Sequence, residues 1–189
     1  LPVIYQDIVG FVLILSIGVI HGANDLLIIK KYTKKDSLKN QISYFLYYLG
    51  LVLLGFLFFY VFPSIALLSF ILVSIYHFGE QHWESISLTI NKYKGGKIFP
   101  IILHGSIFFL IIFKNNIDVV NDVLSNFIPI FLDNVVLQIL LILLFSIYML
   151  LLLSFEILRR YLIGEFLFFL LLYFLTMNST LIYGFSVYF

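Results

Sequence analysis

Residues 65–84 read IALLSFILVSIYHFGEQHWE, and this stretch decides how the chain is organised. Its first ten residues carry no charge, whereas its last eight contain two histidines, two glutamates and the only tryptophan of the chain. About 20 predominantly apolar residues can cross the hydrocarbon core of a bilayer as one helix. An ionisable group in such a segment costs about 2.5–3.5 kcal/mol on insertion scales and is usually kept there for a task. The stretch therefore predicts a transmembrane helix that ends in a functional cluster.

The composition places the whole chain among the polytopic membrane proteins. Of the 189 residues, 62% are hydrophobic and 11% are charged, whereas a soluble domain is about 45–50% apolar and about 25% charged. The formal net charge of +1 gives no basic surface for a nucleic acid. The absence of cysteine excludes disulfides, thiolate metal sites and iron–sulfur clusters. Any metal must then be held by His, Asp or Glu.

Apolar runs along the chain predict an all-α transmembrane helix bundle of six spans plus the start of a seventh. The six predicted spans cover residues 8–29, 42–62, 65–84, 98–113, 134–158 and 162–177. Residues 114–133 are less apolar, with Asp118 and Asp122 on one helical side, and predict one helix that lies in the membrane interface. We expect residues 1–189 to form a single transmembrane domain.

Both ends of the sequence indicate a fragment. The start, Leu1-Pro2-Val3, has neither an initiator methionine nor the basic segment of a signal peptide. The apolar run that begins at Leu181 stops at Phe189, and nine residues are too few to cross a bilayer as a helix. We therefore expect the C-terminal part of the fold to be missing, and the chain alone to be inactive.

The basic residues predict the orientation. Ten of the 11 Lys and Arg residues lie in the loops after the first, third and fifth predicted spans, and only Lys114 falls on the other side. Cytoplasmic loops carry the excess of Lys and Arg. The distribution predicts a multi-pass protein with its N-terminus outside and these three loops in the cytoplasm. We expect the membrane to be the plasma (inner) membrane.

All four histidines lie in predicted spans, and three different spans carry His21, His77 and His104 to a comparable depth in the cytoplasmic half of the membrane. Imidazole suits iron, copper, nickel and zinc, so this residue type alone does not choose the metal. A lone histidine in a membrane is more often a hydrogen-bond partner between helices than a ligand. The convergence favours the ligand interpretation for His21 and His77, whereas for His104 a ligand role and a packing or hydrogen-bonding role both stay open.

Carboxylates accompany two of these histidines. Asp25 follows His21 by four residues and Glu80 follows His77 by three, which places each carboxylate on the same helical side as its histidine. A metal-bound imidazole usually donates its other N–H to a carboxylate or carbonyl. His82 follows His77 by five residues, or roughly 140° around a helix, so the two cannot easily share one ion.

The remaining charged residues near the fifth and sixth spans have a simpler interpretation. Glu156, Arg159, Arg160 and Glu165 are predicted to be interfacial anchors and ion pairs.

Four motifs resemble a known family. Residues 18–25 read GVIHGAND, 76–80 YHFGE, 103–105 LHG and 183–189 YGFSVYF. In order and spacing, over essentially the whole chain, they resemble the Brp/Blh family of bacterial and archaeal integral-membrane beta-carotene 15,15'-dioxygenases, which make retinal for rhodopsins. The local departures are Asn24, where the family often has a hydrophobic residue, and His82, where an acidic residue is common.

The resemblance implies a non-haem Fe(2+) enzyme that cleaves beta-carotene with O2 inside the lipid bilayer, with a functional link to a retinal-binding rhodopsin. It implies His21 and His77 as metal ligands, with further ligands after Phe189. His104, Asp25 and Glu80 are then additional ligands or hydrogen-bond partners of ligands. Tyr76 and Trp83 flank the cluster, and we expect them to contact the substrate. The 22 Phe and 13 Tyr could line a polyene tunnel, although packing within the bundle is the more common role of such residues.

Two other functions fit the same composition. Paired transmembrane histidines also hold haem in electron carriers, which a Soret band would reveal. Histidine and glutamate also form relays in proton- or ion-coupled transporters, which often contain inverted repeats; inspection finds no such repeat.

Overall fold

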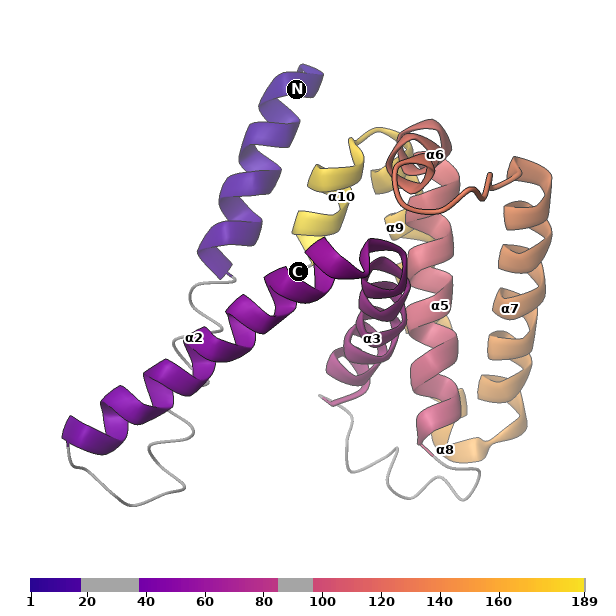
Figure 1. Cartoon of the computed structure of the whole chain (residues 1–189). Helices are drawn as coiled ribbons and strands as arrows, with labels where there is room; N and C mark the ends of the chain where they lie inside the picture. The colour runs from indigo at the N-terminus through magenta and orange to yellow at the C-terminus, as the bar shows by residue number, and fades with distance from the viewer. Residues whose placement is uncertain (18–37, 85–96, 189) are drawn as a thin grey trace.

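The computed structural model describes residues 1–17, 38–84 and 97–188, and every regular element within these ranges is a helix (Figure 1). The helices are the N-terminal helix Val3–Ile17, α2 Leu38–Val61, α3 Pro63–Glu84, α5 Ile98–Asn115, α6 Ile117–Ser125, α7 Asn134–Ser154, α8 Glu156–Arg159, α9 Leu162–Met177 and α10 Leu181–Tyr188. The predicted all-α class is confirmed.

Four of these helices are long and apolar enough to cross a membrane: α2, α3, α5 and α7. They correspond to the second, third, fourth and fifth predicted spans. The N-terminal helix and α9 are apolar but shorter, and most of the first predicted span lies outside the described residues. The count of six spans and the single-domain division therefore stay predictions.

Helix α5 lies at the centre of the bundle and packs against α3, α7, α9 and α10 (Figure 1). Within the most apolar stretch of α5, 56% of the residues are buried inside the bundle, whereas none are buried in the corresponding stretch of α2. Ile107, Phe108 and Ile112 of α5 are fully buried in the apolar core. Side chains on α5 are therefore the ones most shielded from lipid.

Two glycines bring α3 and α5 into backbone contact. A Cβ added to Gly79 of α3 would lie 1.9 Å from the carbonyl oxygen of Ile101, and a Cβ added to Gly105 of α5 would lie 1.8 Å from that of Ile75. Small residues let membrane helices approach closely where packing and hydrogen bonds hold them together. This contact brings the end of α3 beside the start of α5.

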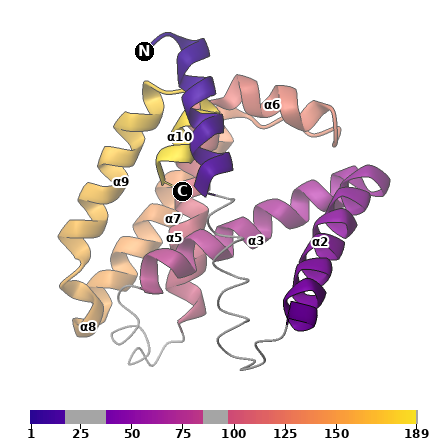
Figure 2. The same ribbon diagram turned by 90° about the vertical axis from the view of Figure 1, so that its left-hand side faces the viewer.

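The interfacial prediction for residues 114–133 was too long. Residues 114 and 115 belong to α5, and α6 covers only Ile117–Ser125, across the end of the bundle (Figure 2). The buried Asn121 of α6 holds the chain that follows the helix, because its side chain donates to the carbonyl of Leu132 (3.0 Å) and accepts from the Leu132 N–H (2.8 Å). The interfacial position of α6 stays a prediction.

The fifth predicted span, 134–158, is likewise divided. Helix α7 ends at Ser154, the extended backbone of Phe155 follows, and α8 begins at Glu156.

The N-terminal helix packs against α10, far away in the sequence. The side-chain oxygen of Gln6 accepts a hydrogen bond from the backbone N–H of Thr180 (2.9 Å), and a Cβ on Gly10 would lie 2.9 Å from Cγ2 of Ile182. At its other end, α10 reaches α3, where the Tyr188 hydroxyl lies 3.4 Å from the carbonyl of Phe78. The N-terminal helix and α3 are thus both in contact with α10.

Candidate functional site

A buried polar cluster joins four helices at the centre of the bundle. It consists of His82 from α3, His104 from α5, Tyr148 from α7 and Glu165 from α9. One oxygen of Glu165 lies 2.6 Å from Nε2 of His82. The other lies 3.1 Å from Nδ1 of His104 and accepts a hydrogen bond from the Tyr148 hydroxyl at 2.8 Å. A single carboxylate therefore ties three other helices to α9.

The two imidazoles of this cluster are stacked, with ring centroids 3.8 Å apart and 17° between the ring planes. His104 and Glu165 are almost completely buried, at 0% and 4% exposure. A buried carboxylate is stable only when hydrogen bonds and a positive charge compensate its desolvation. An imidazolium or a bound cation can supply that charge here.

The cluster could hold a metal ion. One ligand atom from each of His82, His104 and Glu165 lies within 4.8 Å of the others. Two imidazoles and one carboxylate form the ligand set of many non-haem Fe(II) oxygenases. The Nε2 atom of His104 is buried without a hydrogen-bond partner among the described residues, so this imidazole keeps one nitrogen available.

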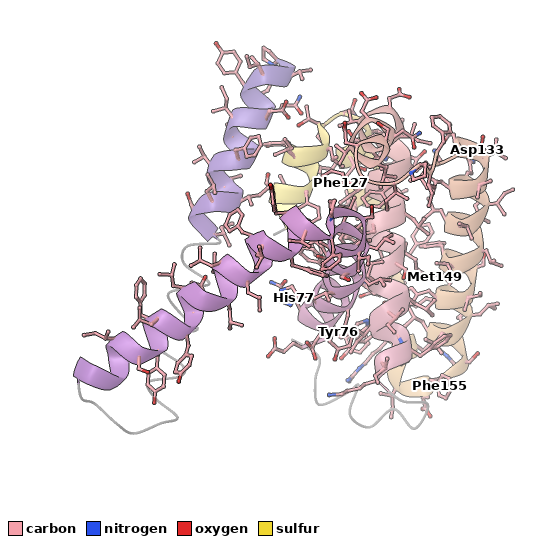
Figure 3. All side chains as sticks on the ribbon, in the orientation of Figure 1. Tyr76, His77, Phe127, Asp133, Met149 and Phe155 are labelled. Carbon is pink, nitrogen blue, oxygen red and sulfur yellow. The ribbon has the colours of Figure 1, made fainter. Side chains whose placement is uncertain are left out.

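His77 lies on a different side of α3. Its side chain is exposed and points away from α5 and α7 (Figure 3). Within the described part of the chain no hydrogen bond reaches its ring nitrogens, and its ring is in edge contact with Phe78 at 5.8 Å between centroids. The separation of His77 from His82 is the one expected for residues five apart on a helix. His77 is thus an imidazole open to a ligand from outside the bundle core.

The neighbours of His77 form a second, smaller polar group. The Tyr76 hydroxyl donates to Glu80 at 2.9 Å, one helical turn along α3. Trp83, by contrast, is only 1% exposed and packs between His82 and Tyr161, with centroid distances of 6.0 Å to each. Tyr76 is therefore open to a ligand that approaches His77, whereas Trp83 faces the core.

Comparison with known proteins identifies the family of the chain. A model of the beta-carotene 15,15'-dioxygenase family matches residues 12–189. The chain belongs to this family. No curated protein and no solved structure matches it significantly. The resemblance seen in the motifs around His21, His77 and His104 is thereby confirmed at the level of the family.

Membership of the beta-carotene 15,15'-dioxygenase family does not by itself assign the site residues. His21 and Asp25 lie outside the described residues. Among the others, the structure brings His104 to the buried cluster and leaves His77 and Glu80 on a separate side of α3. The predicted ligand and substrate roles of these residues stay predictions.

Sequence reasoning missed Glu165. Its predicted role as an interfacial anchor was wrong, because its side chain is buried and accepts hydrogen bonds at the centre of the bundle. A signal was present: Glu165 is the only charged residue of α9, a helix otherwise almost wholly apolar. An isolated ionisable residue within an apolar segment usually faces the bundle interior and finds a partner there.

Proposed function

We propose that this protein is an iron(II)-dependent dioxygenase that cleaves the central 15,15' double bond of beta-carotene with O2 to give two molecules of retinal. The family match over residues 12–189 carries the proposal. Each oxygen atom of O2 ends in one of the two aldehydes, so the reaction balances without another reductant. Four helices able to cross a membrane also suit a substrate that dissolves only in the bilayer.

Two sets of side chains compete for the iron, and access for the substrate favours the set that contains His77. His104 and Glu165 are almost completely buried, at 0% and 4% exposure. The His77 side chain, by contrast, is exposed and so accessible to a substrate that approaches from outside the bundle core. We assign the iron to His77 together with His21, as the resemblance implies. Iron(II) held there supplies the activation of O2.

The residues around His77 have supporting roles in this proposal. Glu80 lies on the same side of α3 as His77, and its negative charge compensates part of the charge of the cation. The hydrogen bond from Tyr76 to Glu80 fixes the position of both side chains. The cluster around Glu165 acts behind this site, where its hydrogen bonds hold α3, α5, α7 and α9 in register.

The cellular setting follows from the same proposal. Retinal as the product links the enzyme functionally to a retinal-binding rhodopsin. The distribution of Lys and Arg supports an N-terminus outside, and we propose the plasma (inner) membrane as the location.

The reaction is tested by expressing the full-length gene in cells that accumulate beta-carotene and measuring retinal by chromatography. We expect retinal to form and the orange colour to fade. Persistent beta-carotene without retinal, with the protein present in the membrane, would contradict the proposal.

The metal assignment needs two matched variants. We expect His77→Ala to lose iron from the purified protein and Glu165→Gln to retain it, with the metal content measured by mass spectrometry. The opposite result would place the iron in the buried cluster.

A further inference from the structure

The buried cluster gathers four side chains at nearly the separations of a tetrahedral metal site. Among His82, His104, Tyr148 and Glu165, neighbouring nitrogen and oxygen atoms lie 2.6, 2.8, 3.1 and 3.4 Å apart. Zinc binds such atoms at about 2.0–2.2 Å, so neighbouring ligand atoms in its tetrahedral sites lie roughly 3.3–3.6 Å apart. Shifts of about 1 Å would therefore bring these atoms around one ion.

The charge of Glu165 favours a metal ion over a proton in this cluster. Its side chain is buried, and both ion pairs that it forms in the described part of the chain are with histidines. A histidine compensates a carboxylate only when it is protonated, and two imidazoles stacked 3.8 Å apart repel each other if both are charged. A divalent cation compensates the carboxylate while both imidazoles bind it as neutral ligands.

The surroundings of the cluster fit a closed metal site. Among the described residues, His104 forms hydrogen bonds only through Nδ1, toward Glu165 and Tyr148. The ring of Phe168 covers both imidazoles, at centroid distances of 5.2 and 5.3 Å. The side chain of His82 is 20% exposed, so an ion can enter from the end of α3. A site in which protein side chains supply all four ligands is typical of structural zinc, whereas a catalytic site keeps one position open.

We propose that His82, His104, Tyr148 and Glu165 bind a structural zinc ion, separate from the iron proposed at His77. A given set of nitrogen and oxygen ligands binds zinc more tightly than iron(II). The ion joins α3, α5, α7 and α9 and leaves no coordination position for O2. It therefore stabilises the bundle and takes no part in the cleavage of the substrate.

Metal content tests this proposal in the full-length protein, purified in detergent without a histidine tag. We expect mass spectrometry to find one zinc ion per chain in addition to iron. The first matched pair is Glu165→Gln, which removes the buried charge at nearly constant volume, and Glu156→Gln, which removes the same charge from an exposed residue of α8.

The affinity for zinc is measured after a chelator has removed the bound metal, by competition between the protein and a coloured chelator for added zinc. Loss of an outer hydrogen-bond partner of a ligand already weakens metal binding about 10- to 100-fold. We therefore expect Glu165→Gln, which removes a ligand, to bind zinc at least about 100-fold more weakly than the unchanged protein. We expect the affinity of Glu156→Gln to be unchanged.

A second pair keeps the test valid if Glu165→Gln does not fold. His82→Gln changes a partly exposed residue of the cluster, and His77→Gln changes an exposed histidine on the same helix. We expect His82→Gln to lose zinc and retain iron, and His77→Gln to lose iron and retain zinc. Absence of zinc from the unchanged protein, or equal zinc affinity in each variant and its control, would overturn the proposal.

Cobalt(II) tests the arrangement of the ligands, because it can replace zinc and absorbs visible light much more strongly in tetrahedral than in octahedral sites. The spectrum is recorded as the difference from Glu165→Gln, so that cobalt bound elsewhere cancels. We expect strong absorption from the unchanged protein and a weaker, shifted band from Tyr148→Phe. Identical spectra from these two proteins would contradict Tyr148 as a ligand.

The zinc site and the proposed reaction fail in different ways. Formation of retinal by a protein without zinc in the cluster would contradict the zinc site and support the reaction. Zinc that is lost on Glu165→Gln, in a protein that forms no retinal, would support the zinc site and contradict the reaction.

Discussion

Replacing Gly105 with alanine should push α3 and α5 apart. The added Cβ would lie 1.8 Å from the carbonyl oxygen of Ile75, whereas Cβ atoms essentially never approach another heavy atom within 3.0 Å. The carbonyl must therefore retreat by about 1.2 Å, and because it belongs to the backbone of α3, the helix must move with it. Overpacking of this kind costs about 1–3 kcal/mol, and we expect the free energy of unfolding to fall by that amount.

The assay is reversible unfolding in mixed detergent micelles, followed by the fluorescence of Trp83, which lies on α3 near the contact. Gly50→Ala in α2 and Gly164→Ala in α9 are matched controls, since a Cβ at either position meets no atom within 4 Å. We expect both controls to be neutral or stabilising by up to about 1 kcal/mol, because alanine favours helix over glycine.

A double variant sharpens the test. Gly79 and Gly105 lie at the same crossing, so separation of the helices caused by one alanine makes room for the other. We expect Gly79→Ala and Gly105→Ala together to cost less than the sum of their separate effects, with a coupling of at least about 0.5 kcal/mol. The reasoning is refuted if Gly105→Ala unfolds as easily as Gly50→Ala, or if the two changes are strictly additive.

Three further substitutions test polar contacts through the same free energy of unfolding. Tyr148→Phe removes one of the hydrogen bonds to the buried Glu165 and should cost about 1–3 kcal/mol; no loss would mean that the carboxylate does not need this donor. Asn115→Leu removes a side-chain amide that lies 2.8 Å from Oγ1 of Thr176, and a cost of about 1 kcal/mol is expected, against none if that bond is absent. Asp133→Ala removes the N-cap of α7, which should cost about 0.5–2 kcal/mol, whereas Asp133→Asn should retain most of the stability.

The helices themselves could be predicted because membrane insertion leaves a strong signal in the sequence. The span predicted at 65–84 became α3 at Pro63–Glu84, since an uninterrupted apolar run follows a proline that suits the first turn of a helix. The interfacial segment could be predicted only in part. Helical periodicity does not reveal the bond between the Asn121 side chain and Leu132, eleven residues away, which holds the chain after α6 against that helix.

The buried cluster of His82, His104, Tyr148 and Glu165 could be predicted from the sequence only in part. Register alone correctly separates His77 from His82 on α3. The register of one helix cannot reveal that Glu165, 83 residues after His82 in the sequence, is the hydrogen-bond partner of His82. That contact depends on how α9 packs against α3 and α5. Residues that meet across helices need the packing of the whole bundle, which neither hydropathy nor spacing encodes.

The hydrogen bond between Gln6 and Thr180 has a consequence for biosynthesis. The two residues are 174 positions apart, and a ribosome adds roughly 5–20 residues per second, so the first helix waits on the order of ten seconds or more before its partner is made. During that interval Gly10 and its neighbours face lipid or the insertion machinery instead of α10. Closure between these two helices is therefore a late event in the assembly of the nascent chain.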